Sequence, residues 1–203
     1  MRYGGLYLVT PDYTPGKFMD IVRSAIAGGI DVLQYRDKSN TKQVRLEVAS
    51  RLRSVCNESG VPFIVNDDVD VALKSGADGV HIGKGDTPYQ DARDRMGRGT
   101  VGVSVYGDVE LAAAYENMGS DYVSFGPFFH TDSKRDAQIY DIGVLKEAHS
   151  RLRKPVLVIG GISEKNILEV AGFGVDGVAV ISAIFGSSDP EGAARRLKNL
   201  LNR

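Results

Sequence analysis

Residues 62–86 read PFIVNDDVDVALKSGADGVHIGKGD. The stretch contains two short apolar runs, at 63–65 and 79–82, which are typical of buried strands. Between them, residues 69–76 have the composition of two helical turns closed by a glycine. A strand, a helix and a second strand in so few residues predict a βαβ unit, whose two strands run parallel. Both predicted strands therefore end at the same edge of the sheet.

A carboxylate follows each of these strands, Asp67 after the first and Asp86 after the second. No basic residue stands obviously between the two acids, so they are expected to repel each other unless a divalent cation takes their oxygens. Helix capping is the other interpretation. Asp67 or Asp68 can cap the helix that begins near Val69, and Asp86 can cap a helix near Pro88. The spacing alone leaves both roles open.

The composition is that of an ordinary globular protein. The chain has 203 residues, 42% of them hydrophobic and 25% charged. Lys+Arg at 25 and Asp+Glu at 26 nearly cancel, and no basic run with interleaved aromatic residues occurs, so nucleic acid is not an expected partner. The lone Cys56 excludes an intrachain disulfide and a paired-cysteine metal site. With no apolar run long enough to span a membrane, and with the first residues leading directly into a predicted strand, we expect a cytoplasmic protein that does not bind membranes.

The alternation of strand and helix continues through the whole chain. Apolar runs, each followed by a helical pattern, predict eight β/α units with strands at 6–9, 32–35, 63–65, 79–82, 101–104, 122–125, 156–159 and 178–181. Eight such units predict an α/β fold, a (β/α)₈ TIM barrel of eight parallel strands with outer helices, in one domain over residues 1–203. An open, doubly wound sheet of eight strands is the alternative.

A repeated motif supports this count. The pattern Gly-x-Asp-x-Val/Leu precedes every second predicted strand, and its copies begin at Gly29, Gly76, Gly119 and Gly174. The glycine is expected to end the preceding helix in a left-handed conformation, and the aspartate to start the turn into the next strand. Alternation around a closed barrel agrees with layered packing from alternate strands.

Polar side chains gather where the predicted strands end, which is where this barrel carries its chemistry. Alternation from Gln34 through Arg36 to Lys38 can turn all three toward one side, although Arg36 and Lys38 can also be solvated loop charges. Gly160-Gly161 and Ser182 follow strands seven and eight, the recurrent phosphate site of this fold. The predicted rim contains Gln34, Arg36, Lys38, Asn66, Asp67, Asp86, Ser104, Thr131, Ser133, Lys134, Gly161 and Ser182.

This rim indicates two phosphorylated ligands, a metal-bound polyphosphate beside the two acids and a monophosphate beside the glycines after strand seven. No Ser/His/Asp or Cys/His arrangement suggests nucleophilic catalysis. His81 lies inside a strand between apolar neighbours and is expected to be a core histidine with satisfied hydrogen bonds. The pattern favours a reaction that needs charge stabilisation, such as loss of diphosphate followed by capture of the resulting cation.

The chain resembles the thiamine-phosphate synthase family, from Leu6 to the final helix. The motifs that carry the resemblance, in order, are residues 34–38, 65–69, 76–83 with Asp86, 102–104, 126–129 with Thr131 and Lys134, 159–162 with Asn166, and 180–184. The resemblance implies a (β/α)₈ barrel that joins hydroxymethylpyrimidine diphosphate to a thiazole phosphate, carboxylated or not, and releases diphosphate.

The resemblance also implies roles for individual residues. Mg²⁺ would be bound by Asp67 and Asp86. The pyrimidine diphosphate would be bound by Gln34, Tyr35, Arg36, Asp37, Lys38, Asn66, Ser104 and Lys134, of which Lys134, Ser104 and Arg36 would be catalytic. The thiazole phosphate would be bound by Thr131, Asp132, Ser133, Gly161, Ile181 and Ser182.

The chain departs from the family pattern at four positions. His130 stands where the family usually has Pro, Ser133 where Thr is frequent, Lys84 where Gln is frequent and Tyr106 where His is common. Two other functions stay open. A thiazole tautomerase of the sister family would have a catalytic histidine at the position of Pro127, and a non-enzymatic sensor would bind the thiazole phosphate without turnover.

Overall fold

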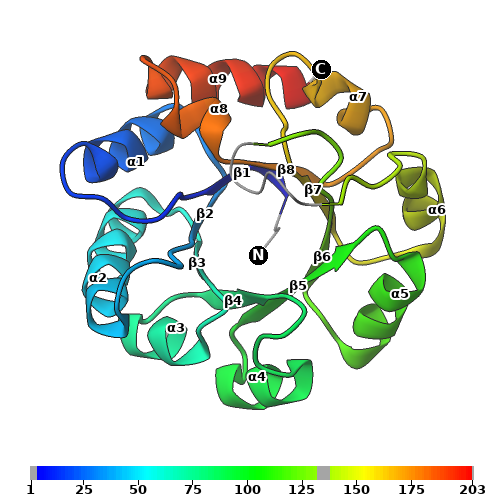
Figure 1. Cartoon of the computed structure of the whole chain (residues 1–203), viewed down its shortest axis with the longest axis horizontal. Coiled ribbons are helices and arrows are strands. Elements are labelled where there is room, and N and C mark those ends of the chain that lie inside the picture. Colours follow the sequence, from blue (N-terminus) through cyan, green and yellow to red (C-terminus); the bar gives the residue numbers. More distant parts are fainter. Residues whose placement is uncertain (1–3, 132–137, 203) are drawn as a thin grey trace.

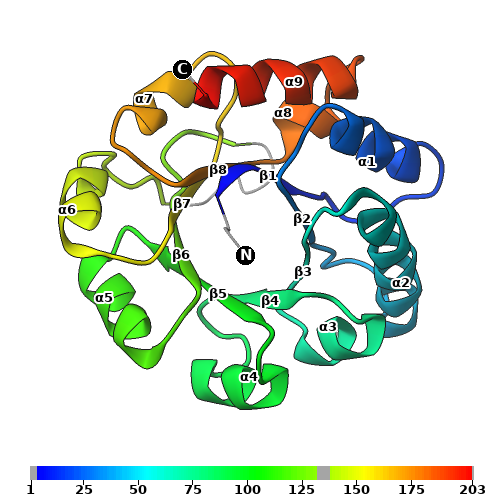
Figure 2. The same ribbon diagram turned by 180° about the vertical axis from the view of Figure 1, so that it is seen from behind.

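The structure is a computed structural model that describes residues 4–131 and 138–202. Eight parallel strands form a closed barrel in sequence order, and the helices surround it as an outer ring (Figure 1 and, from behind, Figure 2). The strands are β1 (Gly5–Val9), β2 (Val32–Tyr35), β3 (Phe63–Asn66), β4 (Gly79–Ile82), β5 (Thr100–Tyr106), β6 (Tyr122–Phe125), β7 (Val156–Ile159) and β8 (Gly177–Val180). The helices are α1 (Phe18–Ala27), α2 (Lys42–Ser59), α3 (Val69–Ser75), α4 (Tyr89–Met96), α5 (Val109–Met118), α6 (Val144–Arg151), α7 (Ile167–Ala171), α8 (Ser182–Phe185) and α9 (Pro190–Leu201).

Pairing of the first and last strands closes the barrel. Strand β1 pairs with β8 from Gly5 opposite Gly177 to Leu8 opposite Val180. An open, doubly wound sheet would leave these two strands as edges. The (β/α)₈ barrel predicted from the sequence is therefore confirmed.

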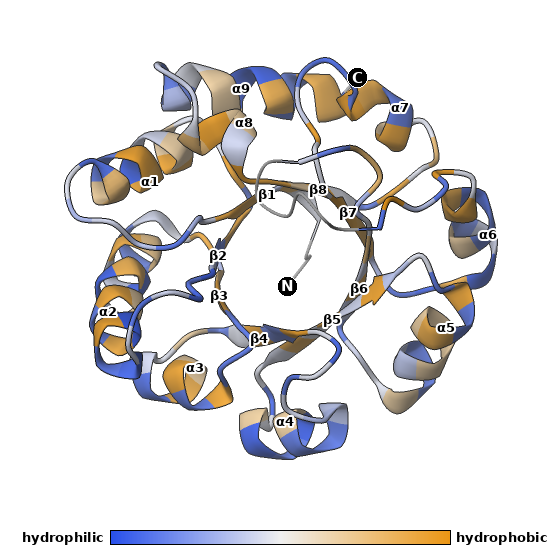
Figure 3. Ribbon diagram, viewed as in Figure 1, coloured by the Kyte–Doolittle hydropathy of each residue, from blue (hydrophilic) through white to orange (hydrophobic). Residues whose placement is uncertain are grey.

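The apolar core has two layers, because successive side chains of a strand point to opposite faces. In β1, Leu6 and Leu8 belong to the large cluster between barrel and helices, whereas Tyr7 and Val9 belong to a smaller cluster with residues of β2, β3, β6, β7 and β8 inside the barrel. Figure 3 shows both apolar and polar residues on the outer helices. Within residues 4–131 and 138–202, no helix combines the length and apolar composition needed to cross a membrane.

The Gly-x-Asp motifs tie consecutive strands together at the amino-terminal end of the barrel. The four glycines have φ between +70° and +96°, which confirms the predicted left-handed conformation. Each aspartate makes two hydrogen bonds to one residue near the start of the preceding strand. Its backbone N–H donates to the carbonyl oxygen of that residue, and its carboxylate accepts from the N–H of the same residue. The pairs are Asp31 with Leu6, Asp78 with Phe63, Asp121 with Val101 and Asp176 with Val156, at 2.7–2.8 Å for the carboxylate contacts. The aspartate thus does more than start a turn.

The chain segments that follow β7 and β8 have local features of their own. Ser163 does not cap α7, which begins at Ile167; the Ser163 N–H donates to Asn166 Oδ1 at 2.8 Å. We expected strand eight to reach Ile181, but β8 ends at Val180 and the chain turns at once into the short helix α8. This helix escaped prediction because its four residues are too few to show a helical period.

Candidate active site

A cavity of about 380 Å³ opens at the carboxyl ends of the barrel strands. Its lining includes side chains from β1 to β7 and the loops that follow β6, β7 and β8. The predicted site residues that line it are Gln34, Arg36, Asn66, Ser104, Thr131, Gly161, Ile181 and Ser182. These residues, which are spread along the chain from Gln34 to Ser182, therefore line a single cavity.

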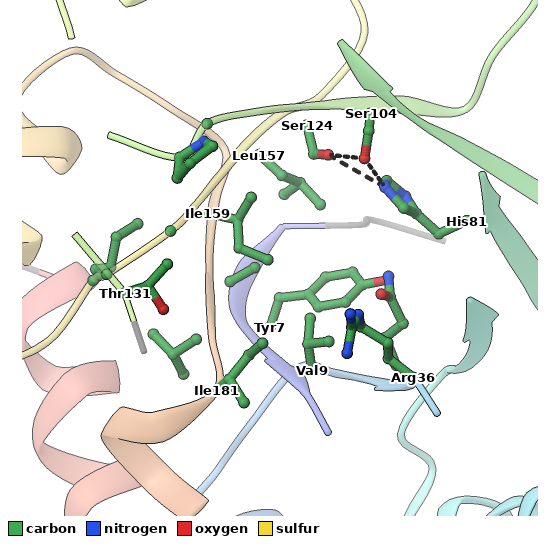
Figure 4. Close-up of a pocket in the computed structure, with 18 of the residues that line it drawn as sticks. Tyr7, Val9, Arg36, His81, Ser104, Ser124, Thr131, Leu157, Ile159 and Ile181 are labelled. Atoms are coloured by element: carbon green, nitrogen blue, oxygen red, sulfur yellow. Dashed lines mark hydrogen bonds between the residues drawn. The ribbon is translucent and has the colours of Figure 1, made fainter. Parts of the chain in front are cut away.

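A row of buried polar groups forms the floor of this cavity. The Gln34 amide nitrogen donates to Tyr7 Oη at 3.0 Å, and Tyr7 Oη lies 2.8 Å from Tyr122 Oη. His81 connects the row to the other side, with Nδ1 3.0 Å from Tyr122 Oη and Nε2 2.9 Å from Ser104 Oγ. Figure 4 shows His81 and Ser104 together at the side of the cavity away from Thr131.

His81 has its hydrogen bonds satisfied in the core, as the sequence predicted. Burial lowers the pKa of its imidazole to about 4, and the nearby Asp67 carboxylate opposes that shift only in part. The ring is therefore uncharged near neutral pH. The prediction did not place His81 at the site, but its hydrogen-bond partners show that it lies in the floor of the cavity.

Three floor residues, Tyr7, Tyr122 and Ser124, were not predicted from the sequence. One signal was present: β5 contains Gly102 opposite Tyr122, and a Cβ at Gly102 would lie 2.1 Å from the Tyr122 ring. A glycine inside a strand often marks such a close approach. The glycine therefore makes room for the aromatic ring inside the barrel.

The acid pair lies on the rim beside the floor. Asp68, not Asp67, caps α3 by accepting from the Val71 N–H at 3.0 Å, and Asp67 has a left-handed backbone with φ of +64°. Asp86 does not cap α4. Its carboxylate accepts from the Gly83 N–H at 2.8 Å, and α4 has no side-chain cap. The capping role thus falls to Asp68 alone, which leaves Asp67 and Asp86 available on the rim.

The two carboxylates lie near each other. Burial raises the pKa of Asp86 above its ordinary value, and the neighbouring Asp67 carboxylate raises that pKa further, while the Gly83 N–H and Lys38 act in the opposite direction. A basic neighbour is present, contrary to the expectation from the sequence, since Lys38 Nζ lies 2.6 Å from Asp67 Oδ2. Residue 38 reaches the acids because it follows β2, the neighbour of β3 in the barrel.

This pair fits the donor set that a hard divalent cation prefers. Two neighbouring carboxylates gain from a shared cation, because it removes their mutual repulsion. Among the described residues, no group of three or more His, Cys, Asp or Glu side chains could hold a metal ion. A cation bound by Asp67 and Asp86 would therefore take its other ligands from water and phosphate oxygens, as is usual for Mg²⁺.

Three of the described residues predicted to bind the pyrimidine diphosphate do not line the cavity: Lys38, which lies on the rim beside Asp67, and Tyr35 and Asp37. Tyr35 lies in the cluster between barrel and helices, and its hydroxyl donates to Asp37 at 2.8 Å. Asp37 also accepts from Tyr13 and from the backbone and side chain of Asn40. Alternation along β2 explains this, since Gln34 faces the barrel interior and Tyr35 faces the helices. Asp132, Ser133 and Lys134 lie outside the described residues.

The far end of the cavity is built from the loops after β6, β7 and β8. Gly161 has φ of +67°, and a Cβ there would lie 2.4 Å from the His130 carbonyl oxygen, so the loop after β6 packs directly on this glycine. Asn166 donates to the Gly161 carbonyl oxygen at 3.0 Å and fixes the loop. Figure 4 shows Thr131 and Ile181 at this end, with Ile159 on the side toward the floor.

Tyr106 forms part of the cavity wall at the end of β5. The register with β6 shifts between Ser104 and Tyr106, and Tyr106 has a left-handed φ of +59°. Its hydroxyl accepts from the Lys84 N–H at 3.2 Å. A tyrosine therefore joins the loop after β4 to the cavity wall at a position where the family commonly has histidine.

Comparisons with known proteins agree on one family. The family model described as thiamine monophosphate synthase matches residues 6–184. A thiamine-phosphate synthase of Thermoplasma acidophilum is 54% identical over 200 residues, covering 98% of this chain and 93% of that protein. One from Picrophilus torridus is 41% identical over 203 residues, covering 100% and 99%. The solved structure of a thiamine phosphate pyrophosphorylase from Pyrococcus furiosus superposes with a TM-score of 0.90 at 34% identity, covering 99% of this chain and 96% of that one.

Proposed function

The chain belongs to the thiamine monophosphate synthase family, and from that premise we propose that it joins hydroxymethylpyrimidine diphosphate to a thiazole phosphate, carboxylated or not, in a Mg²⁺-dependent transfer. The products are thiamine monophosphate and diphosphate, with carbon dioxide as a third product where the thiazole is carboxylated. The observation that carries the proposal is one cavity with two unlike ends. One end has Arg36, Ser104 and the adjoining acid pair, and the other has Gly161, Ser182 and the start of α8.

Positively charged side chains near the acid pair suit a diphosphate leaving group. The Arg36 guanidinium lines the cavity, and Lys38 stands on the rim beside Asp67. Cationic groups in place before the reaction stabilise the negative charge that develops on the departing oxygens. Asp67 and Asp86 would hold Mg²⁺, which when bound would supply further positive charge to the same oxygens. Lys134, named by the resemblance, would add a cation from outside the described residues.

The bond changes in this proposal need no proton abstraction from carbon. The C–O bond between the pyrimidine methylene and the diphosphate breaks first, and both electrons leave with the oxygen. The aminopyrimidine ring shares the positive charge left on the methylene, and the lone pair of the thiazole nitrogen forms the new C–N bond. Gln34, Asn66 and Ser104 offer hydrogen bonds that orient the pyrimidine diphosphate, and apolar walls such as Leu157 and Ile159 exclude water from the cation.

A phosphate at the far end would hold the thiazole in place. The first N–H groups of a helix have no partner within it, and α8 begins at the cavity edge with Ser182. Thr131 and Gly161 lie around the same end. Asp132 and Ser133 stay predictions from the resemblance, and the cytoplasmic location and the lack of a nucleic-acid partner stay predictions from the composition.

A coupled assay for diphosphate release tests the proposal with both substrates, with and without Mg²⁺. We expect one diphosphate per thiamine monophosphate, only with both substrates and Mg²⁺ present. Isomerisation of the thiazole phosphate in the absence of the pyrimidine substrate would instead indicate a tautomerase, and binding of the thiazole phosphate without turnover would indicate a sensor. For the tautomerase, loss of isomerisation on replacing His130 would be the supporting result, whereas we expect that replacement to have little effect on transfer.

Two substitutions test the assigned rim. Asp67→Ala and Lys134→Ala are expected to abolish turnover and to keep the far-ultraviolet circular dichroism of the wild type. Asp91→Ala, which removes an exposed acid from α4, serves as the control and should retain full activity. Unchanged rates in both rim variants would refute the assignment.

A further inference from the structure

Tyr106 stands at the cavity wall in a backbone conformation that tyrosine rarely adopts. It is the last residue of β5, and its φ is +59°. A bulky residue with a left-handed backbone is an outlier, and such outliers collect at functional sites, where the surrounding structure holds them in place. Ser104 and Tyr106 both line the cavity, whereas Val105 between them is fully buried in the cluster between barrel and helices.

The contacts of Tyr106 fix its position and leave one hydrogen to donate. Its carbonyl oxygen accepts from the Gly126 N–H at 2.8 Å, and its ring lies 6.5 Å from the ring of Tyr140. Its hydroxyl accepts from the Lys84 N–H at 3.2 Å, and a phenol oxygen that accepts a hydrogen bond still has its own hydrogen. Within residues 4–131 and 138–202, no acceptor takes that hydrogen. The hydroxyl is therefore a donor at the wall of the cavity.

This hydroxyl lies near the acid pair and near Ser104. A Cβ at Gly83 would be 3.3 Å from Tyr106 Oη, 3.4 Å from Asp86 Oδ2 and 3.7 Å from Ser104 Cβ, so the three side chains meet around one point. Asp86 Oδ2 is already the acceptor of the Gly83 N–H at 2.8 Å. Phosphate oxygens that share a cation with the acid pair would come to the same place.

We propose that Tyr106 is a substrate-binding residue whose hydroxyl donates its hydrogen to an oxygen of the diphosphate at the acid-pair end of the cavity. A hydrogen bond to a phosphate oxygen is charge-assisted and stronger than one between neutral groups. It strengthens as negative charge gathers on the departing oxygens, so it favours cleavage of the C–O bond. The inference rests on the proposed function for the identity of the ligand, but not for the position of the hydroxyl.

A crystal structure of the wild-type protein with Mg²⁺ and inorganic diphosphate tests the contact directly. We expect Tyr106 Oη to lie about 2.5–3.0 Å from a diphosphate oxygen. A diphosphate bound more than about 3.5 Å from this hydroxyl, or bound away from the acid pair, would overturn the proposal. The structure would also show whether the Lys84 N–H still donates to Tyr106 when the ligand is bound.

Isothermal titration calorimetry measures what the hydroxyl contributes. Tyr106→Phe keeps the ring, and we expect it to raise the Kd of inorganic diphosphate in the presence of Mg²⁺ at least about tenfold. The Kd of the thiazole phosphate should stay within about twofold of the wild type. An unchanged Kd for diphosphate would overturn the proposal, as would equal losses for both ligands, which would show a general disturbance of the cavity.

Tyr89→Phe is the matched control. It removes the hydroxyl of a buried tyrosine on α4, where the phenol oxygen accepts from Arg93 Nε at 3.4 Å, and it should change neither Kd. Inorganic diphosphate needs no turnover, so these measurements are separate from the test of the proposed function. A wild type that binds diphosphate but releases none from the two substrates would refute the proposed function, and the crystal contact and the two Kd values would still decide the role of Tyr106.

Discussion

Replacing Gly102 by alanine tests the close packing on which the cavity floor depends. The new Cβ would lie 2.1 Å from Cζ and 2.5 Å from both Cε atoms of Tyr122. Carbon atoms pack best at about 3.5–4.0 Å, so the ring would have to move by at least about 1.4 Å. Tyr122 is fully buried inside the barrel with Tyr7 and His81 against it, so a movement of this size, even toward the cavity that it lines, would break those packing contacts.

The expected loss has two parts. Overpacking of a dense core costs roughly 1–3 kcal/mol. The same movement breaks the hydrogen bonds of Tyr122 to Tyr7 and His81, now 2.8 and 3.0 Å, and each is worth about 1 kcal/mol. We therefore expect Gly102→Ala to lower the free energy of unfolding by about 3–5 kcal/mol.

Urea denaturation followed by far-ultraviolet circular dichroism measures this loss. The matched control is Gly172→Ala at the end of α7, where the new Cβ would lie 3.4 Å from the Leu168 carbonyl oxygen, an ordinary contact. This control should stay within about 0.5 kcal/mol of the wild type. A Gly102→Ala protein equally close to the wild type would show that the ring yields easily and would refute the reasoning.

Three further predictions concern single side chains. Burial raises the pKa of Asp37, but hydrogen bonds from neighbouring donors outweigh this effect and hold the pKa below its usual range. The ionised carboxylate therefore stabilises the fold fully above about pH 4, and this stabilisation is lost as the pH falls further. In urea titrations at decreasing pH, the free energy of unfolding of Asp37→Asn should decline less steeply than that of the wild type. Asp78→Ala should lower the free energy of unfolding by about 2 kcal/mol, because the Phe63 N–H loses its acceptor, while Asp91→Ala changes it little. In steady-state kinetics, Arg36→Ala should raise KM for the pyrimidine diphosphate at least about tenfold and affect the thiazole phosphate less; equal effects on both would contradict the placement of Arg36.

The sequence predicted the barrel because its signals are local and repeated. Each strand is a short apolar run, and the four glycines of the Gly-x-Asp motif have the left-handed conformation that glycine favours, two of them, Gly76 and Gly119, as the caps of α3 and α5. The rim followed from topology, since parallel strands end on one face. Asp67 and Asp86 were predicted to lie together for this reason, and they do.

The parts that escaped prediction depend on contacts between distant residues. The motif at residues 34–38 does not show that Tyr35 and Asp37 turn toward the helices, because adjacent residues in a motif need not share a face. Nor does a tyrosine in an apolar strand show that its hydroxyl meets His81 from another strand. Such pairings come from barrel register, which no single segment contains.

The four aspartate contacts at the amino-terminal end divide the barrel into strand pairs. Each joins an odd strand to the even strand that follows it, so all four contacts are internal to the segments that carry β1–β2, β3–β4, β5–β6 and β7–β8. A polypeptide split at the turn between α4 and β5 would keep two of the four aspartate contacts intact in each half. Because every aspartate contact then stays within one half, this turn is a suitable place to test fragment complementation or circular permutation.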